Sequence, residues 1–273
     1  MFKLYGSLSI FLFVISWVLL GCKKEEDRAI DRACYPLVYK INGTTVASIK
    51  LDRDNLPINN YLKDSLGNEL GYASYRWDAS GRMIRYQHFT SDTQSLAFLT
   101  FTWNELGRLS RASSFEPTSG GQSLEEVLYE TYEYDDLGRI IRRNLFDNHT
   151  GIPKLAGYTK FNFNTYGNVV RDSTFNKVGS IFKFVITREY ESDFKNNPSR
   201  HHIRPIKVPF VNAYYLSRYN LNKMSVRDST GLLSIESYTT VTDYNSDNYP
   251  IKELQTDLSG KVTTYEFDYN CRP

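Results

Sequence analysis

The chain has 273 residues, of which 41% are hydrophobic and 15% aromatic, and its formal net charge is +2. This apolar content is enough to bury a core and excludes a disordered chain, and the 21 Tyr and 16 Phe against 3 Met favour strands over helices. A charge so close to zero gives no electrostatic basis for nucleic acid as a partner, and we expect none.

Residues 1–21 have the composition of an export signal. Lys3 is the only charged residue before an uncharged run over residues 4–20, which is just long enough to cross a membrane, so a signal-anchor helix is the alternative. The stretch 19–22, Leu-Leu-Gly-Cys, resembles a bacterial lipobox, which implies that Cys22 is lipidated and becomes the first residue of the mature protein. We therefore predict a signal peptide over 1–21, a lipid anchor that attaches Cys22 to the membrane, and a tether over 22–33.

A short charged segment, Lys-Lys-Glu-Glu-Asp, follows Cys22 directly. It is similar to the export tags of lipoproteins in the Bacteroidota. This resemblance implies an outer-membrane location and leaves open whether the protein faces the cell surface. A solvated tether between the lipid and the domain is the alternative interpretation of the same residues.

Two cysteines remain once Cys22 is assigned to the anchor. Cys34 lies at the start of the folded part and Cys271 lies three residues from the end of the chain. An exported protein meets an oxidising compartment, so this even pair permits a disulfide. Two free thiols are the alternative. Neither cysteine has a second Cys or a His close in sequence, so we expect no metal site.

Residues 34–273 form one domain of imperfect hairpin repeats. Asn42-Gly43 is the first hairpin signal, and later copies place Gly or Asn three residues after an Asp or Asn. The Asp can hydrogen-bond the backbone two residues on, and the Gly accepts the left-handed conformation that closes the turn. The copies recur every 25 to 31 residues, a period that holds two strands and two turns. The left-handed turn residues are predicted at Gly81, Gly107, Gly138, Gly167, Asn196 and Asn248, with weaker copies at Asn55 and Lys223.

Each repeat also carries an aromatic pair before the turn and a basic residue after it. The aromatics alternate at strand spacing, and core packing is the favoured role over a ligand platform. We predict that each basic residue lies directly across from the earlier aromatic, as in Tyr75 with Arg85, where its stem covers the ring. A stabilising ladder is the favoured role of this row and an anion-binding track is the alternative. The candidate binding residues are Arg85, Arg111, Arg142, Arg171, Arg200 and Arg227.

Three copies, Trp77–Arg82, Trp103–Arg108 and Tyr134–Arg139, carry Gly-Arg and resemble YD repeats, the units of RHS and teneurin-type proteins. The resemblance implies a continuous antiparallel sheet that coils or closes. Shells that enclose a toxin use many more repeats and a self-cleavage segment, which this chain lacks. Teneurin-like relatives suggest adhesion or carbohydrate contact by analogy of fold.

The sequence therefore predicts an all-β domain, an antiparallel up-and-down meander of about 17 to 18 strands that twists or closes into a barrel-like or spiral sheet. No catalytic motif is found, and His201-His202 fits a solvated loop better than a metal site. We expect a non-catalytic envelope lipoprotein, a binding or structural module without a cofactor that contacts a glycan or another envelope protein. The alternatives are a hydrolase with carboxylates inside the sheet and a periplasmic carrier of an apolar ligand.

Overall fold

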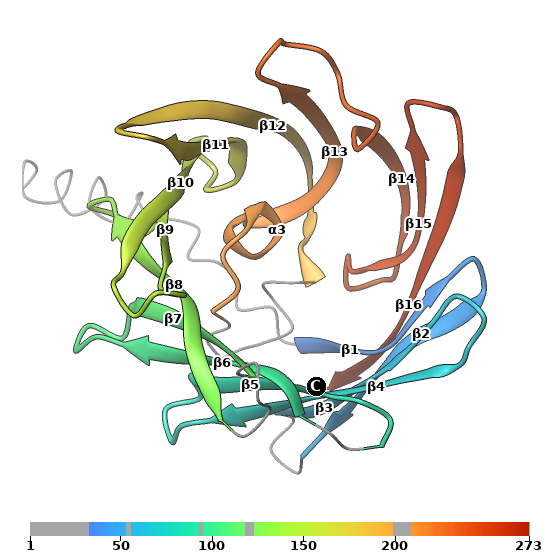
Figure 1. Ribbon diagram of the computed structural model, residues 1–273. Coiled ribbons are helices and arrows are strands. Elements are labelled where there is room, and N and C mark those ends of the chain that lie inside the picture. Colours follow the sequence, from blue (N-terminus) through green and yellow to red (C-terminus); the bar gives the residue numbers. More distant parts are fainter. Residues whose placement is uncertain (1–32, 53–55, 93–94, 118–122, 199–208, 273) are drawn as a thin grey trace, which may run out of the picture.

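The computed structural model describes residues 33–52, 56–92, 95–117, 123–198 and 209–272, which form a closed antiparallel barrel of 16 strands (Figure 1). Every strand pairs with its neighbours in sequence, and β1 pairs with β16 to close the ring. The strands are β1 Ala33–Ile41, β2 Thr44–Leu51, β3 Pro57–Lys63, β4 Glu69–Trp77, β5 Met83–Phe89, β6 Ser95–Trp103, β7 Leu109–Pro117, β8 Leu124–Tyr134, β9 Ile140–Asp147, β10 Lys154–Phe163, β11 Val169–Val178, β12 Ile181–Asn196, β13 Tyr219–Asp228, β14 Tyr238–Tyr244, β15 Pro250–Asp257 and β16 Val262–Arg272.

The closing seam joins the two ends of the domain in register. Ala33 pairs with Arg272, and Ile41 pairs with Tyr265 at the other end of the strand. A ring of this kind leaves no unpaired sheet edge among the described strands, which removes a common route to aggregation. The predicted all-β meander is confirmed, with 16 strands in place of 17 to 18.

The barrel has two ends, and the repeat places each kind of turn at one of them. We call the mouth the end where β1 begins, β16 ends and the turns after β2, β4, β6, β8, β10 and β14 lie. The opposite end is the base. None of the helices in the described part of the chain is long and apolar enough to cross a membrane.

The mouth turns are held by the side chain of their first residue. In the turn after β8, one oxygen of Asp135 accepts hydrogen bonds from the N–H groups of Leu137 at 3.0 Å and Arg139 at 2.8 Å. Gly138 has φ +76°, a left-handed conformation that any Cβ would strain. The same conformation recurs in the turns of the neighbouring repeats, with φ values between +61° and +83° at Gly81, Gly107, Gly167 and Asn248.

The left-handed turn predicted at Asn196 is wrong, because β12 continues through this residue. The weaker copy at Lys223 is wrong for a related reason, since this residue lies inside β13. Both predicted turns flank a single long connection from β12 to β13, where the chain leaves the wall. Counting this one connection as two turns explains the overestimate of the strand number. Asn55 lies outside the described residues.

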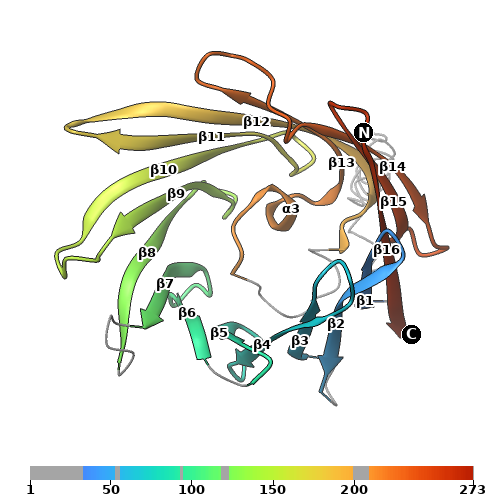
Figure 2. The same ribbon diagram turned by 45° about the vertical axis from the view of Figure 1, so that its right-hand side comes forward.

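The described last part of the connection between β12 and β13 lies inside the barrel. Figure 2 shows the short helix α3, Ala213–Leu216, surrounded by the strands, and we call residues 209–217 the plug. On one side of the barrel, the ring of Phe210 meets Tyr86 edge-on at 5.4 Å, and the Arg143 guanidinium donates to the carbonyl of Val211 at 3.1 Å. On the other side, the hydroxyls of Tyr214 and Tyr238 are in contact.

The plug completes a core whose other members face inward from the strands. The buried core consists of Met83, Phe101, Leu109, Ile140, Phe161, Val169, Tyr190, Val211, Ala213 and Leu221. Buried polar groups anchor the plug at its end: Ser217 accepts a hydrogen bond from the Val169 N–H at 3.1 Å, and Asn197 donates to the Ser217 carbonyl at 2.9 Å. The described residues 209–217, which carry no repeat pattern, therefore occupy the interior.

Successive repeats are joined by the aromatic residue that precedes each turn. The indole of Trp103 donates to the carbonyl of Met83 at 2.8 Å, and the hydroxyl of Tyr134 donates to the carbonyl of Leu109 at 2.7 Å. Each acceptor belongs to the repeat before the donor. The aromatic body packs in the core while its polar end satisfies a carbonyl, which is the usual arrangement for a buried Tyr or Trp.

Candidate functional site

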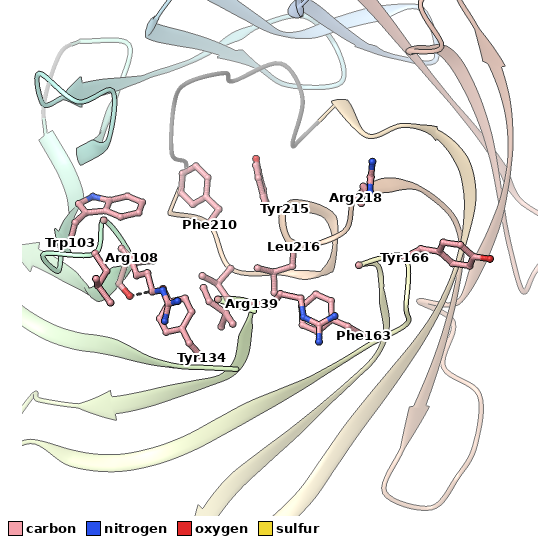
Figure 3. Close-up of a pocket in the computed structure, with 17 residues that line it drawn as sticks. Trp103, Arg108, Tyr134, Arg139, Phe163, Tyr166, Phe210, Tyr215, Leu216 and Arg218 are labelled. Atoms are coloured by element: carbon pink, nitrogen blue, oxygen red, sulfur yellow. Dashed lines mark hydrogen bonds between the residues drawn. The ribbon is translucent and has the colours of Figure 1, made fainter. Parts of the chain in front are cut away.

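A pocket of about 540 Å³ lies at the mouth between the plug and the turns after β6, β8 and β10 (Figure 3). Its wall is built from repeated positions: the aromatic before each turn and the glycine and arginine that close it. Its inner side is formed by the plug. The described lining holds three arginines and no carboxylate, His, Cys, Ser or Lys. The lining residues are Trp103, Leu106, Gly107, Arg108, Leu109, Tyr134, Gly138, Arg139, Ile140, Phe163, Tyr166, Gly167, Phe210, Val211, Tyr215, Leu216 and Arg218.

Arg139 is neutralised within its own turn. Its Nε donates to the second carboxylate oxygen of Asp135 at 2.7 Å, and its guanidinium lies 4.8 Å from the centre of the Phe163 ring. Burial alone would raise the pKa of Asp135, but hydrogen bonds from the Arg139 backbone and side chain outweigh burial and lower it. The carboxylate is therefore charged at neutral pH and balances Arg139.

Arg108 occupies the same turn position one repeat earlier, but its turn begins with Asn104. The amide oxygen of Asn104 accepts the Arg108 N–H at 2.9 Å, which preserves the turn without supplying a negative charge. The Arg108 guanidinium lies 5.3 Å from the centre of the Tyr134 ring, and no carboxylate in the described part of the chain forms an ion pair with it. A cation without a counter-charge therefore lies in the pocket.

The rest of the pocket supplies apolar surface and a third cation. Arg218 follows the plug and lies 5.4 Å from the centre of the Tyr219 ring. Burial raises the pKa of Tyr134 to about 12, against the opposing effects of the Arg108 charge and the hydrogen bond to Leu109, so the phenol is neutral. Figure 3 shows Phe210 and Leu216 on the plug side and Phe163 and Tyr166 on the wall side. Guanidinium groups beside aromatic surface suit an anion that also has an apolar body.

The predicted basic row lies elsewhere, on the outer face of the wall. Arg85 pairs with Arg76 rather than facing Tyr75, and Arg111 and Arg142 are displaced in the same way. The predicted facing pairs are therefore wrong by one residue, because a register shift beside each turn adds one residue to the strand that leaves it. The aromatics of the earlier position face the core and the arginines face outward.

Outside, three of these arginines cover a ring of the next strand. The guanidinium carbons of Arg85, Arg111 and Arg142 lie 3.9, 3.6 and 4.0 Å from ring centres on the neighbouring strands. Arg111 also pairs with Glu126 at 2.7 Å, and Arg171 pairs with Glu189 at 2.7 Å. These contacts are those of a stabilising ladder in which Arg111 and Arg171 are balanced by carboxylates, whereas Arg85 lies across from Arg76.

The two remaining members of the row differ. Arg227, which also faces outward, donates to the carbonyl of Gly231 at 3.2 Å in the turn after β13. Arg200 lies outside the described residues. None of the six candidate arginines is among the residues that line the mouth pocket.

A second group of polar side chains lies inside the barrel, opposite the pocket. Asn220 donates to Glu253 at 3.3 Å and to the hydroxyl of Tyr244 at 3.2 Å, and Tyr244 donates in turn to Asp193. Burial, together with the Asp193 charge, raises the pKa of Glu253 to about 7, while the hydrogen bond from Asn220 opposes the shift. Two carboxylates are thus linked through neutral donors.

The histidines and cysteines do not form a metal site in the residues that the structure describes. No group of three or more His, Cys, Asp or Glu is placed to bind a metal among them. Burial lowers the pKa of His88, whose ring meets Tyr86 edge-on at 4.7 Å, and His149 bonds Asp147 in a base turn at 2.9 Å. His201 and His202 lie outside the described residues. Cys34 and Cys271 occupy directly paired positions of β1 and β16.

Sequence reasoning found the Gly-Arg turns but not their role. Arg108 and Arg139 were noted only as part of a repeat motif, and Arg218 was not singled out. The available signal was the change from Asp to Asn at the first position of one turn, which removes the partner of the following arginine. That the three arginines line one pocket follows only from closure of the barrel and return of the plug.

The fold has counterparts among solved structures, although no family model and no curated protein matches the chain. A porin-like protein from Bacteroides vulgatus ATCC 8482 matches with a TM-score of 0.52 and 12% identity, over 86% of this chain and 99% of the other. A porin-like protein from Bacteroides uniformis ATCC 8492 gives 0.44 and 10%, over 86% and 98%. The TcdB2–TccC3 structure gives 0.31 and 10%, over 79% of this chain and 12% of the other.

The strand order and the mouth pocket define the class of structure to which this chain belongs. The chain is a closed antiparallel barrel, and it shares this fold with the Bacteroides vulgatus porin-like protein. At 12% identity the likeness concerns the fold alone. Membership among the YD-repeat proteins stays a prediction based on the three Gly-Arg turns.

Proposed function

We propose that this chain is a lipid-anchored, non-catalytic binding protein of the outer membrane and that its mouth pocket binds an acidic saccharide. The observation that carries this proposal is Arg108, which forms no ion pair with a described carboxylate and lies in a pocket whose described lining holds three arginines and no carboxylate. An arginine fork matches the geometry of a carboxylate or phosphate. The apolar C–H faces of a sugar ring would pack against the aromatic side chains beside it.

The side chains on the outer and inner faces of the barrel favour attachment to the membrane by a lipid anchor over strands that span the membrane. Transmembrane barrels present an apolar band to lipid and a polar interior. This barrel has the opposite arrangement, with charged pairs such as Arg171 and Glu189 outside and a plugged apolar core inside. A wall of this kind is compatible with water. The lipid predicted at Cys22 would then supply the attachment to the membrane.

The pocket favours binding over catalysis. Its described lining lacks the Asp, Glu, His, Cys, Ser and Lys side chains that act as nucleophiles or proton carriers near neutral pH. The interior pair of Glu253 and Asp193 is the specific observation that keeps a hydrolase as the second candidate. A binding protein tolerates Glu253→Gln, whereas a hydrolase using this pair loses turnover of its glycan.

Thermal unfolding of the full-length lipoprotein with acidic and neutral oligosaccharides tests the proposal. At a ligand concentration one hundred times Kd, binding to the folded state adds about 2.7 kcal/mol, which raises the midpoint by roughly 5–10 °C in a domain of this size. We expect the rise with oligogalacturonate and not with neutral maltose oligomers.

The matched control is Arg82→Gln. Arg82 has the same turn position as Arg108 but is paired with Asp78 at 2.7 Å and does not line the pocket. Arg108→Gln should abolish the rise while Arg82→Gln keeps it. Equal loss in both variants, or no rise in the unsubstituted protein with any acidic saccharide, would contradict the proposed function.

A further inference from the structure

The direction in which the mouth points follows from the chain topology. We propose that the mouth faces the membrane that holds the anchor, and that the acidic ligand is the headgroup of a glycolipid in that same membrane. This inference rests on the proposed function, because it names the source of the acidic saccharide that the pocket binds.

The first step is the place where the tether meets the barrel. β1 begins at Ala33 and runs from the mouth to the turn at Asn42-Gly43, which lies at the base. β16 ends at the mouth as well, since Ala33 pairs with Arg272. The segment that leads back to Cys22 therefore leaves the domain at the same end as the pocket.

The second step is the length of the tether compared with the size of the barrel. Residues 22–32 comprise 11 residues, which span at most about 36–40 Å when extended. Sixteen strands spaced about 4.8 Å apart and tilted about 40° give a ring roughly 30 Å across. The tether is long enough for the whole mouth to rest on the bilayer. The reverse orientation would use most of the tether to run back along the wall.

The third step is the chemistry of the rim. Leu106 and Tyr166 line the pocket and are 74% and 57% exposed, and the Tyr166 ring meets Phe194 edge-on at 5.4 Å. An acid held by Arg108 would leave the attached alkyl chain next to Leu106 in the same turn. Exposed apolar side chains also occur in the turns at the base, at Leu66 and Leu258, so they do not distinguish the two ends. The proposed orientation rests on the end at which the tether joins the barrel and on the arginines of the mouth pocket. A glycolipid with an acidic headgroup and an alkyl chain would contact both the arginines and the apolar side chains of the pocket.

Two matched turns test the orientation. Ser80 and Ser259 hold the same position in turns at the mouth and at the base, where each N–H bonds the leading Asp at 2.9 and 2.8 Å. The full-length lipidated chain carrying Ser80→Cys or Ser259→Cys is labelled with a fluorophore and reconstituted in vesicles with nitroxide-headgroup lipid. The unsubstituted chain, labelled in parallel, corrects for reaction at the native cysteines. We expect at least twofold stronger quenching at Ser80→Cys, and equal or reversed quenching would overturn the orientation.

The ligand class is tested by separating the acid from the chain. Hexyl glucuronide has both, methyl glucuronide has only the acid, and hexyl glucoside has only the chain. We expect the full-length protein in vesicles to bind hexyl glucuronide at least tenfold more tightly than either of the others. Arg108→Gln should remove the preference for the acid, and Arg82→Gln should keep it.

The outcomes separate this inference from the proposed function. Equal binding of hexyl and methyl glucuronide overturns the glycolipid source and leaves a pocket for soluble acidic saccharides. Binding of hexyl glucoside as tight as hexyl glucuronide overturns both, because the arginines would then have no role. Preference for hexyl glucuronide together with stronger quenching at the mouth supports both.

Discussion

The buried carboxyl of Glu253 makes the stability of the barrel depend on pH in a defined direction. Burial and the Asp193 charge raise its pKa from 4.5 to about 7, although Asn220 donates a hydrogen bond to it. Between these two values the folded state holds a proton that the unfolded state has released. The free energy of unfolding contributed by this group therefore falls as the pH rises from about 4.5 to about 7, and the loss is complete above that range.

The size of the effect follows from the shift. A difference of about 2.5 pKa units at 1.36 kcal/mol per unit corresponds to about 3 kcal/mol. Glu253→Gln keeps an oxygen that can accept the Asn220 hydrogen bond but cannot ionise. The variant should thus be up to about 3 kcal/mol more stable than the unsubstituted protein at pH 8, with the difference disappearing near pH 4.5.

Urea unfolding at pH 5, 6, 7 and 8 measures this difference. The control is Glu189→Gln, which removes an exposed carboxylate paired with Arg171 on the outer wall. An exposed pair contributes at most about 1 kcal/mol, so the control should run parallel to the unsubstituted protein across this range. Parallel curves for Glu253→Gln as well would refute the reasoning, since the carboxyl would then titrate as it does in the unfolded chain.

Three further predictions concern the seam, the links between repeats and the pocket wall. Cys34 and Cys271 occupy directly paired positions of β1 and β16, and paired positions of antiparallel strands have Cα atoms about 4.5–5.5 Å apart, within the range of a disulfide; we expect an oxidised pair that adds about 5 kcal/mol, measured as a fall in the urea midpoint on reduction and absent in Cys34→Ser. Trp103→Phe removes the donor to the carbonyl of the preceding repeat and should cost about 1–3 kcal/mol in urea unfolding; an unchanged midpoint would show that water replaces the indole. Gly138→Ala and Gly167→Ala both force a side chain into a left-handed turn and should each cost about 1–2 kcal/mol. Only Gly138→Ala places a Cβ 3.1 Å from the pocket arginine, so only it should also weaken acid binding.

The architecture could be read from the sequence because its turns are local. An Asp or Asn that accepts two backbone N–H groups and a residue that adopts positive φ, three positions later, are set by neighbouring residues alone. The same recurrence predicted a continuous meander. The side of the sheet on which Arg85 lies could not be read in this way, because one extra residue after the turn reverses the face and leaves no mark in the composition.

The plug and the pocket depend on contacts between distant residues. Residues 209–217 have no repeat pattern, so nothing local indicates that they lie inside the barrel. The pairing of Asp193 with Asn196 looks like another turn copy, yet β12 runs through it because the chain continues to the plug. Arg108 and Arg218 are 110 positions apart in sequence and line one pocket only in the closed ring. The site therefore lies beyond what turn chemistry can predict.

The plug also bears on how many repeats the barrel can hold. Every wall contact except the seam joins neighbours in sequence, so adding or deleting one hairpin would preserve each local pairing and change only the circumference. The plug touches both sides of the lumen, at Tyr86 and at Tyr238. A wider ring would lose one of these contacts and a narrower ring would not admit α3. The plug therefore sets the number of repeats in the barrel, although the local strand pairing alone would allow more or fewer.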